Sequence, residues 1–216
     1  MIHVDFPNIT TDNLHYEPFF HIEVPYGIVR ETNDQLHDYY LNNATWEQEE
    51  TTDGEHSSLQ NVQWGKEIDY AEWDKFRQRP WLEQLFDVYK LKLPQEFYTA
   101  ICTAKHGKGT SLVPHTDGPP DSSSWTLAER KFKEDLTGII TQHIYILDTD
   151  KYPESGMQLY YSDFDATDPA NLRPVKQIKA LPGTYLSYRN TPNSFHGVPE
   201  QTHDFNRMLV TIKTFW

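Results

Sequence analysis

Four residues in the C-terminal half of the chain could together bind a metal ion and an organic acid. His115 and Asp117 are one residue apart, so on a strand both side chains point to the same face. His196 follows 81 residues after His115, and Arg207 follows 11 residues after His196. Two imidazoles and one carboxylate can hold Fe(II) from one side and leave its other coordination positions open. A guanidinium nearby can bind the far carboxylate of a chelating dicarboxylate through two hydrogen bonds.

The chain from residue 96 onward consists of short β-rich runs separated by turn residues. The expected strands cover residues 97–105, 111–117, 137–147, 157–161, 175–179, 184–188, 194–198 and 207–215. Eight such strands fit two facing antiparallel sheets. The sequence therefore predicts a mainly β fold with flanking α elements. The expected architecture is a jelly roll, or cupin-like barrel, buttressed by N-terminal helices.

The first part of the chain predicts elements that cover this barrel. Residues 19–29 favour an edge strand, and residues 31–41 favour a helix. Apolar side chains at three- to four-residue spacing over residues 70–88 predict two amphipathic helices broken at Pro80. The polar stretch 42–60 is typical of an exposed loop and could act as a lid.

Length and composition favour one domain over residues 1–216. A chain of this size buries roughly 70% of the surface that its unfolded form exposes, so it needs no disulfide or structural metal. No Gly/Ser linker divides it. We therefore expect residues 1–95 to form a strand and helical buttress on a core of residues 96–216. The sequence does not indicate an oligomeric state.

The net charge of −13 makes nucleic acid or an anionic membrane surface a poor partner. The chain contains no run of 18 apolar residues and no basic region followed by an apolar segment at its start. The lone cysteine, Cys102, excludes an internal disulfide and fits a reducing compartment. These features predict a cytoplasmic protein in which Cys102 is a buried, inert thiol.

The four residues also carry a resemblance to a known family. His115, Asp117, His196 and Arg207 resemble the His-x-Asp motif, distal His and downstream Arg of the 2-oxoglutarate- and Fe(II)-dependent dioxygenases. The resemblance covers about residues 97–216. Its implied fold is the double-stranded β-helix.

Two further segments are similar to particular members of that superfamily. Residues 181–188 resemble its penultimate strands, and residues 196–199 (His-Gly-Val-Pro) resemble bacterial and phage oxygenases related to prolyl hydroxylases. Prolyl hydroxylases commonly have a lysine where Arg207 stands, and the turn at residues 154–157 differs from their Gly-Gly-Glu/Asp turn. Prolyl hydroxylation is therefore one candidate activity.

The resemblance implies a reaction and its cofactors. His115, Asp117 and His196 would hold Fe(II), 2-oxoglutarate would chelate the metal with its far carboxylate on Arg207, and O2 would take the last position. The expected products are succinate, CO2 and a substrate hydroxylated at a C–H bond. The expected substrate is peptidyl or free proline, another amino acid or a small metabolite, and no pattern in the sequence selects among them.

Pairs of polar residues alternate onto one face of three expected strands. The pairs are Thr103 with Lys105, His143 with Tyr145, and Tyr185 with Ser187. If these faces line the barrel interior, the hydroxyls of Tyr145 or Ser187 could donate to the co-substrate carboxylate, as Tyr and Ser do in the family. We expect His143 to be a hydrogen-bonded interior residue instead of a fourth ligand, and His106 to belong to a turn.

A second function class uses the same barrel without oxygen chemistry. A cupin-like metal-binding isomerase or a jelly-roll binding module could have this fold, because one fold supports many functions. Cupins usually supply more histidines and a glutamate on neighbouring strands. They require no arginine eleven residues past the last ligand, so the sequence favours the oxygenase.

Overall fold

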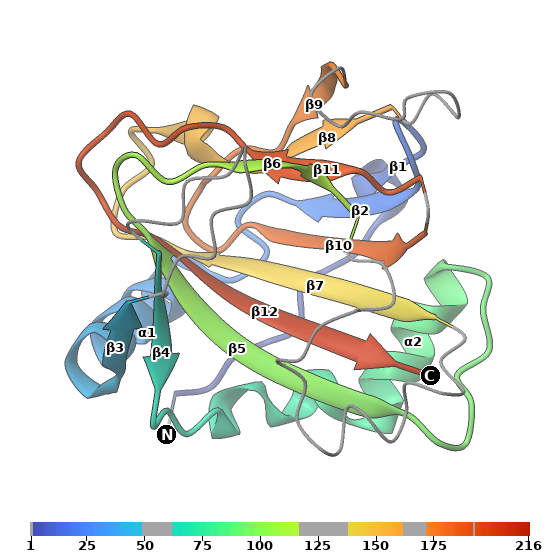
Figure 1. The fold of residues 1–216 in the computed structure, drawn as a ribbon. Coiled ribbons are helices and arrows are strands. Elements are labelled where there is room, and N and C mark those ends of the chain that lie inside the picture. The colour runs from blue at the N-terminus through green and yellow to red at the C-terminus, as the bar shows by residue number, and fades with distance from the viewer. Residues whose placement is uncertain (1, 49–61, 117–137, 162–171, 192) are drawn as a thin grey trace.

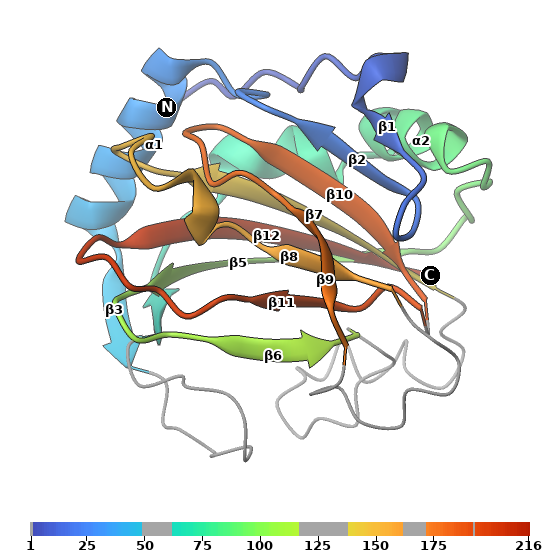
Figure 2. The same cartoon turned by 90° about the horizontal axis from the view of Figure 1, so that it is seen from above.

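A computed structural model describes residues 2–48, 62–116, 138–161, 172–191 and 193–216, which form two facing antiparallel sheets (Figures 1 and 2). The large sheet has the strand order β1-β2-β10-β7-β12-β5-β4-β3 and the small sheet has the order β6-β11-β8-β9. The large-sheet strands are β1 (Leu14–His15), β2 (His21–Val24), β3 (Thr45–Gln48), β4 (Val62–Lys66), β5 (Tyr98–His106), β7 (Ile139–Ile146), β10 (Tyr185–Asn190) and β12 (Arg207–Phe215). The small-sheet strands are β6 (Leu112–His115), β8 (Gln158–Tyr160), β9 (Pro174–Gln177) and β11 (His196–Val198).

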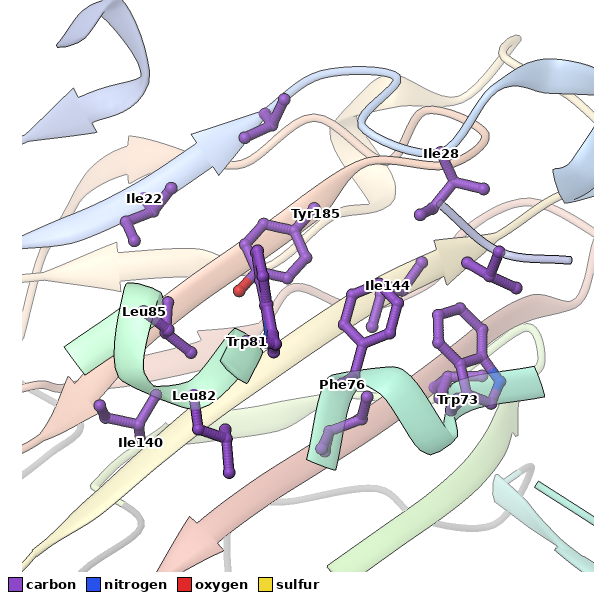
Figure 3. Packing of buried hydrophobic residues seen from close by; sticks show 14 of the residues in the cluster. Ile22, Ile28, Trp73, Phe76, Trp81, Leu82, Leu85, Ile140, Ile144 and Tyr185 are labelled. Carbon is purple, nitrogen blue, oxygen red and sulfur yellow. The ribbon is translucent and has the colours of Figure 1, made fainter. Parts of the chain in front are cut away.

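Helices cover the face of the large sheet that points away from the small sheet. These helices are α1 (Arg30–Asn43), η2 (Ala71–Arg77) and α2 (Arg79–Val88), and two short 3-10 turns, η1 (Thr11–Asn13) and η3 (Pro153–Ser155), lie elsewhere. Figure 3 shows Trp73 and Phe76 of η2 and Trp81 of α2 packed against side chains from β2, β7 and β10. Within the described ranges, no helix is long and apolar enough to cross a membrane.

One apolar cluster lies between the helices and the large sheet, and a second one occupies part of the space between the two sheets. Strand β10 contributes side chains to both clusters, because successive side chains on a strand point to opposite faces of the sheet. Tyr185 packs with the helices, whereas Leu186 and Tyr188 pack in the cluster between the sheets. The alternation decides which side chains reach the interior where the candidate site lies.

The predicted fold class is confirmed. Each of the eight expected strands is present as one of β5 to β12, and β12 has the predicted bounds Arg207–Phe215. Turn residues mark the ends of these strands. Within the strands, apolar residues recur at every second position, which is the side-chain period of a β-strand.

The N-terminal prediction is wrong in three respects. The expected edge strand is the short, buried strand β2, which lies between β1 and β10. Residues 42–48, expected in a loop, belong to the end of α1 and to β3, while residues 49–60 lie outside the described residues. The first of the two expected helices is the 3-10 helix η2, and Pro80 lies in the first turn of α2, where its missing N–H costs little. The N-terminal segment thus adds four strands to the large sheet, not one.

Candidate active site

A cavity of about 290 Å³ lies between the two sheets. Its walls come from β6 and β11 of the small sheet and from β4, β5, β7 and β12 of the large sheet. The lining includes His115, His196, Arg207, His106 and His143. Three of the four residues singled out by their spacing therefore meet at one cavity. The fourth, Asp117, lies outside the described residues.

His115 and His196 are direct neighbours across the small sheet. They are register partners of β6 and β11, and their ring centroids are 4.5 Å apart. Nδ1 of His115 lies 2.8 Å from the carbonyl oxygen of Val113, and Nδ1 of His196 lies 3.0 Å from that of Ser194. A carbonyl only accepts hydrogen bonds, so each Nδ1 carries the proton and each Nε2 keeps its lone pair. This is how a protein orients metal-ligating histidines, so the pair fits a divalent metal.

Gly197 explains why these two strands can approach so closely. A Cβ atom at this position would lie 2.8 Å from the carbonyl oxygen of Leu112 on β6. Any larger residue would push β11 away from β6 and separate His196 from His115. The glycine beside the distal histidine is therefore part of the site.

Tyr188 links His196 to a second interior histidine. Its hydroxyl oxygen lies 3.1 Å from Nε2 of His196 and 3.0 Å from Nε2 of His143. Nδ1 of His143 lies 3.0 Å from Oγ1 of Thr211, so the prediction that His143 is a hydrogen-bonded interior residue is confirmed. Sequence reasoning missed Tyr188, although its alternation with Tyr185 and Ser187 on β10 already put it on the opposite face from them.

Arg207 is fully buried at the start of β12. Its Nη1 donates to the carbonyl oxygen of Ser155 at 3.0 Å and its Nη2 donates to Nδ1 of His106 at 2.5 Å, while its Nε has no hydrogen-bond partner in the described part of the chain. No carboxylate among the described residues forms an ion pair with it. A buried charge without a counter-ion is costly, and burial lowers the pKa of this guanidinium. An anionic ligand in the cavity would supply the missing counter-charge.

His106 is the residue of this site whose place was predicted wrongly. It is not in a turn but at the end of β5, where it is buried and is the register partner of Arg207. Because Arg207 can only donate, Nδ1 of His106 must accept, which requires a neutral imidazole. Burial and the neighbouring Arg207 lower the pKa of His106 well below its usual value, which keeps it neutral. His106 and Ser155 together hold the guanidinium in place.

The structure places Tyr145 beside the guanidinium group of Arg207. Tyr145 is fully buried on β7, and the guanidinium carbon of Arg207 lies 5.8 Å from its ring centroid. Its hydroxyl accepts the backbone N–H of Met157 at 2.9 Å, and no described residue accepts the hydroxyl proton. Burial raises the pKa of Tyr145, so the phenol stays protonated, but Tyr145 is not among the residues that line the cavity.

Ser187 does not meet the condition on which its predicted role depended. Its hydroxyl accepts a hydrogen bond from Tyr89 at 3.0 Å, on the face of the large sheet that the helices cover.

Thr103 and Lys105 are also on the outer face of their strand, since Cys102 and Ala104 line the cavity. Cys102 is half-buried at the cavity wall instead of fully buried. The side chains of alternate residues point to one of the two faces of the sheet, and the sequence did not show which set points to the interior.

No protein-family model and no curated protein sequence matches the chain. Solved structures do match. A viral collagen prolyl hydroxylase from Paramecium Bursaria Chlorella virus-1, in complex with 2-oxoglutarate, is 10% identical with a TM-score of 0.55, covering 90% of this chain and 95% of that one. The chain has the fold of the 2-oxoglutarate- and Fe(II)-dependent dioxygenases. The resemblance found in the sequence is thus confirmed for the fold.

Two other structures with this fold also match the chain. HygX from Streptomyces hygroscopicus, solved with nickel, 2-oxoglutarate and hygromycin B, is 12% identical with a TM-score of 0.54, covering 94% of this chain and 84% of that one. The non-heme α-ketoglutarate-dependent epimerase SnoN from nogalamycin biosynthesis is 11% identical with a TM-score of 0.55, covering 90% and 76%. At this identity the comparisons show that the fold is shared.

Proposed function

We propose that the chain is an Fe(II)- and 2-oxoglutarate-dependent dioxygenase that hydroxylates an unactivated C–H bond. The observation that carries the proposal is the buried Arg207, which has no carboxylate partner among the described residues and lines the same cavity as His115 and His196. A site built only for a metal would have no use for such a cation. A diacid that chelates the metal and reaches the guanidinium explains both features.

Each residue of the site then has a stated task. His115, Asp117 and His196 would hold Fe(II), which supplies oxidation of a bound C–H bond by O2 when 2-oxoglutarate is present. Arg207 binds the far carboxylate of 2-oxoglutarate, and His106 keeps the guanidinium in position. The protein's further contribution is to hold one C–H bond of the substrate beside the metal.

The substrate class follows from the cavity and the charge. The lining combines the site's polar groups with apolar side chains such as Trp64, Leu112 and Val198, which suit a small molecule or a peptide side chain such as proline. The net charge of −13 disfavours nucleic acid and anionic membrane surfaces. The lone cysteine fits action in the cytoplasm.

Turnover of 2-oxoglutarate tests this function. The protein is incubated with Fe(II), 2-oxoglutarate and O2 against a panel of free amino acids, prolyl peptides and small metabolites, and succinate is measured. We expect succinate formation to rise with at least one panel member and to yield a product heavier by one oxygen atom. A product of unchanged mass but inverted configuration would favour an epimerase. Absence of both 2-oxoglutarate binding and succinate would favour a cupin-like isomerase or binding module.

The positioning role of His106 gives a separate prediction. His106→Leu removes the acceptor of an Arg207 hydrogen bond, and a hydrogen bond to a charged group contributes about 1.5–3 kcal/mol. We therefore expect the Kd for 2-oxoglutarate, measured by calorimetry with Mn(II) in place of iron, to rise roughly tenfold or more. Lys105→Met is the matched control, because the Lys105 ammonium lies outside the cavity, 4.2 Å from the centroid of the Trp46 ring. Equal affinities in the two variants would show that His106 does not position Arg207.

A further inference from the structure

A second group of metal-ligating side chains lies on β1 and β2, outside the lining of the cavity. His15, His21 and Glu23 each offer one ligand atom, and these atoms all lie within 4.8 Å of one another. No part of the proposed oxygenase reaction uses these residues. Figure 2 shows β1 and β2 at one end of the large sheet, beside β10.

The register of the two strands builds this cluster. His15 and His21 are direct partners in the antiparallel pair β1–β2, so their side chains project from the same face of the sheet. Their rings are stacked with centroids 5.0 Å apart. Glu23 follows His21 by two residues and therefore shares that face. His21 and Glu23 are buried, while His15 is partly exposed on the edge strand and gives a metal ion access from solvent.

His21 is oriented like a metal ligand. Its Nδ1 lies 2.9 Å from the carbonyl oxygen of Phe19, so Nδ1 carries the proton and Nε2 holds the lone pair. This Nε2 is buried, and no group in the described part of the chain hydrogen-bonds to it. Burial lowers the pKa of His21 to about 4, so the ring is neutral at pH 7. A buried acceptor without a partner is unfavourable, and a bound cation would satisfy it.

We propose that His15, His21 and Glu23 form a binding site for Zn(II) or a similar divalent transition metal, separate from the candidate active site. Imidazole nitrogen and carboxylate oxygen are ordinary zinc ligands, and three protein ligands leave a fourth position for water. Ligand atoms of a tetrahedral zinc site lie about 3.3 Å apart, which follows from bonds of about 2.0–2.2 Å. Separations of up to 4.8 Å exceed this distance, so the side chains must move closer when a metal binds, and His15 is the most exposed of the three.

Lys176 of β9 holds the carboxylate when no metal is bound. Its Nζ lies 2.7 Å from Oε2 of Glu23, and both side chains are largely buried. The ammonium group and a metal ion compete for this carboxylate because both are cations. We therefore expect Lys176→Met to tighten Zn(II) binding by about tenfold or more, since it removes a like charge from beside the metal. An ordinary structural ion pair would give no metal binding in this variant.

The experiment counts zinc ions bound by the full chain in competition with a chromogenic chelator. A double variant, His115→Ala with His196→Ala, removes the candidate active site, and the remaining zinc reports the second site. In this background we expect one equivalent, which His15→Ala and Glu23→Gln each weaken by at least about 100-fold. His3→Ala is the control, because His3 is an exposed histidine outside the cluster. Zinc at 100 times its Kd should also raise the Tm by roughly 5–10 °C.

The outcomes separate this site from the oxygenase. Loss of the equivalent in both His15→Ala and Glu23→Gln, with tighter binding in Lys176→Met, supports the site even if the protein never turns over 2-oxoglutarate. His15→Ala sits on the partly exposed edge strand, so it tests the site without disturbing the core. If the double variant binds no zinc, or if His15→Ala binds it as tightly as its parent, the proposal is wrong.

Discussion

His196→Ala should lower the rate of succinate formation from 2-oxoglutarate by about 1000-fold or more. The variant removes one of the two imidazoles whose Nε2 atoms are presented by backbone carbonyls in the cavity. A catalytic metal contributes several kcal/mol to the reaction, and each 1.36 kcal/mol is a factor of ten in rate. Initial rates of succinate release at saturating Fe(II) and 2-oxoglutarate measure the effect.

His3→Ala is the matched control for this variant, since it also replaces one histidine but on the exposed surface. We expect it to keep the rate of the unchanged protein. His196 is buried and its Nε2 lies 3.1 Å from the Tyr188 hydroxyl, so the Tm of His196→Ala is measured first to show that the variant is folded at the assay temperature. A His196→Ala protein that is folded and retains even a tenth of the rate would exclude His196 as a metal ligand.

Arg207→Met should raise the Kd for 2-oxoglutarate by about 100-fold or more, because truncating one partner of a buried charge pair costs roughly 2–5 kcal/mol. The guanidinium is fully buried, and no residue that the structure describes hydrogen-bonds to its Nε. Methionine fills a similar volume but offers no donor to a carboxylate. Calorimetric titration of the Mn(II)-loaded protein measures the change without turnover.

Two further variants make this prediction specific to the charge at residue 207. Arg77→Met removes an exposed arginine on η2 that pairs with Asp74, and it should leave the affinity unchanged. Arg207→Lys keeps the charge but loses the planar fork, so its affinity should fall between those of the unchanged protein and Arg207→Met. If Arg207→Met binds 2-oxoglutarate normally, the guanidinium is a structural group and the proposed co-substrate site is wrong.

The core strands could be predicted from the sequence because their signals are local. Turn residues bound each run from residue 96 onward, and apolar side chains alternate within it. The meeting of His115 with His196 was predicted only through the motif resemblance, since nothing local states that β6 and β11 are register partners. Pairing of β6 with β11 in the small sheet brings His115 and His196 together although 81 residues separate them in the chain.

The sequence did not predict which residues of neighbouring strands are paired, or which face of the sheet each side chain occupies. These two gaps account for the wrong predictions for His106 and Ser187. His106 reads as a turn residue beside Gly107, yet it pairs with Arg207 because β5 and β12 align over their whole length. Ser187 lies on the helix-covered face because Tyr185 and Tyr188 are oriented by different apolar clusters. Such choices depend on contacts with distant parts of the chain, which a strand's own sequence does not encode.

Three of the four N-terminal strands, β1, β3 and β4, were missed for a related reason. They have two, four and five residues, which is too short for an alternation pattern to be recognised. They are strands because β2, β4 and β5 supply hydrogen-bonding edges for them. Tertiary pairing overrides weak local propensity in such segments.

The most direct test of the central claim is anaerobic addition of 2-oxoglutarate to the Fe(II)-loaded protein, followed by visible absorption. If iron and 2-oxoglutarate meet in the cavity, a weak charge-transfer band should appear with the unchanged protein and should be absent from His196→Ala and Arg207→Ala. No band with the unchanged protein, or an equal band in all three proteins, would contradict the assignment of this cavity as an Fe(II) and 2-oxoglutarate site.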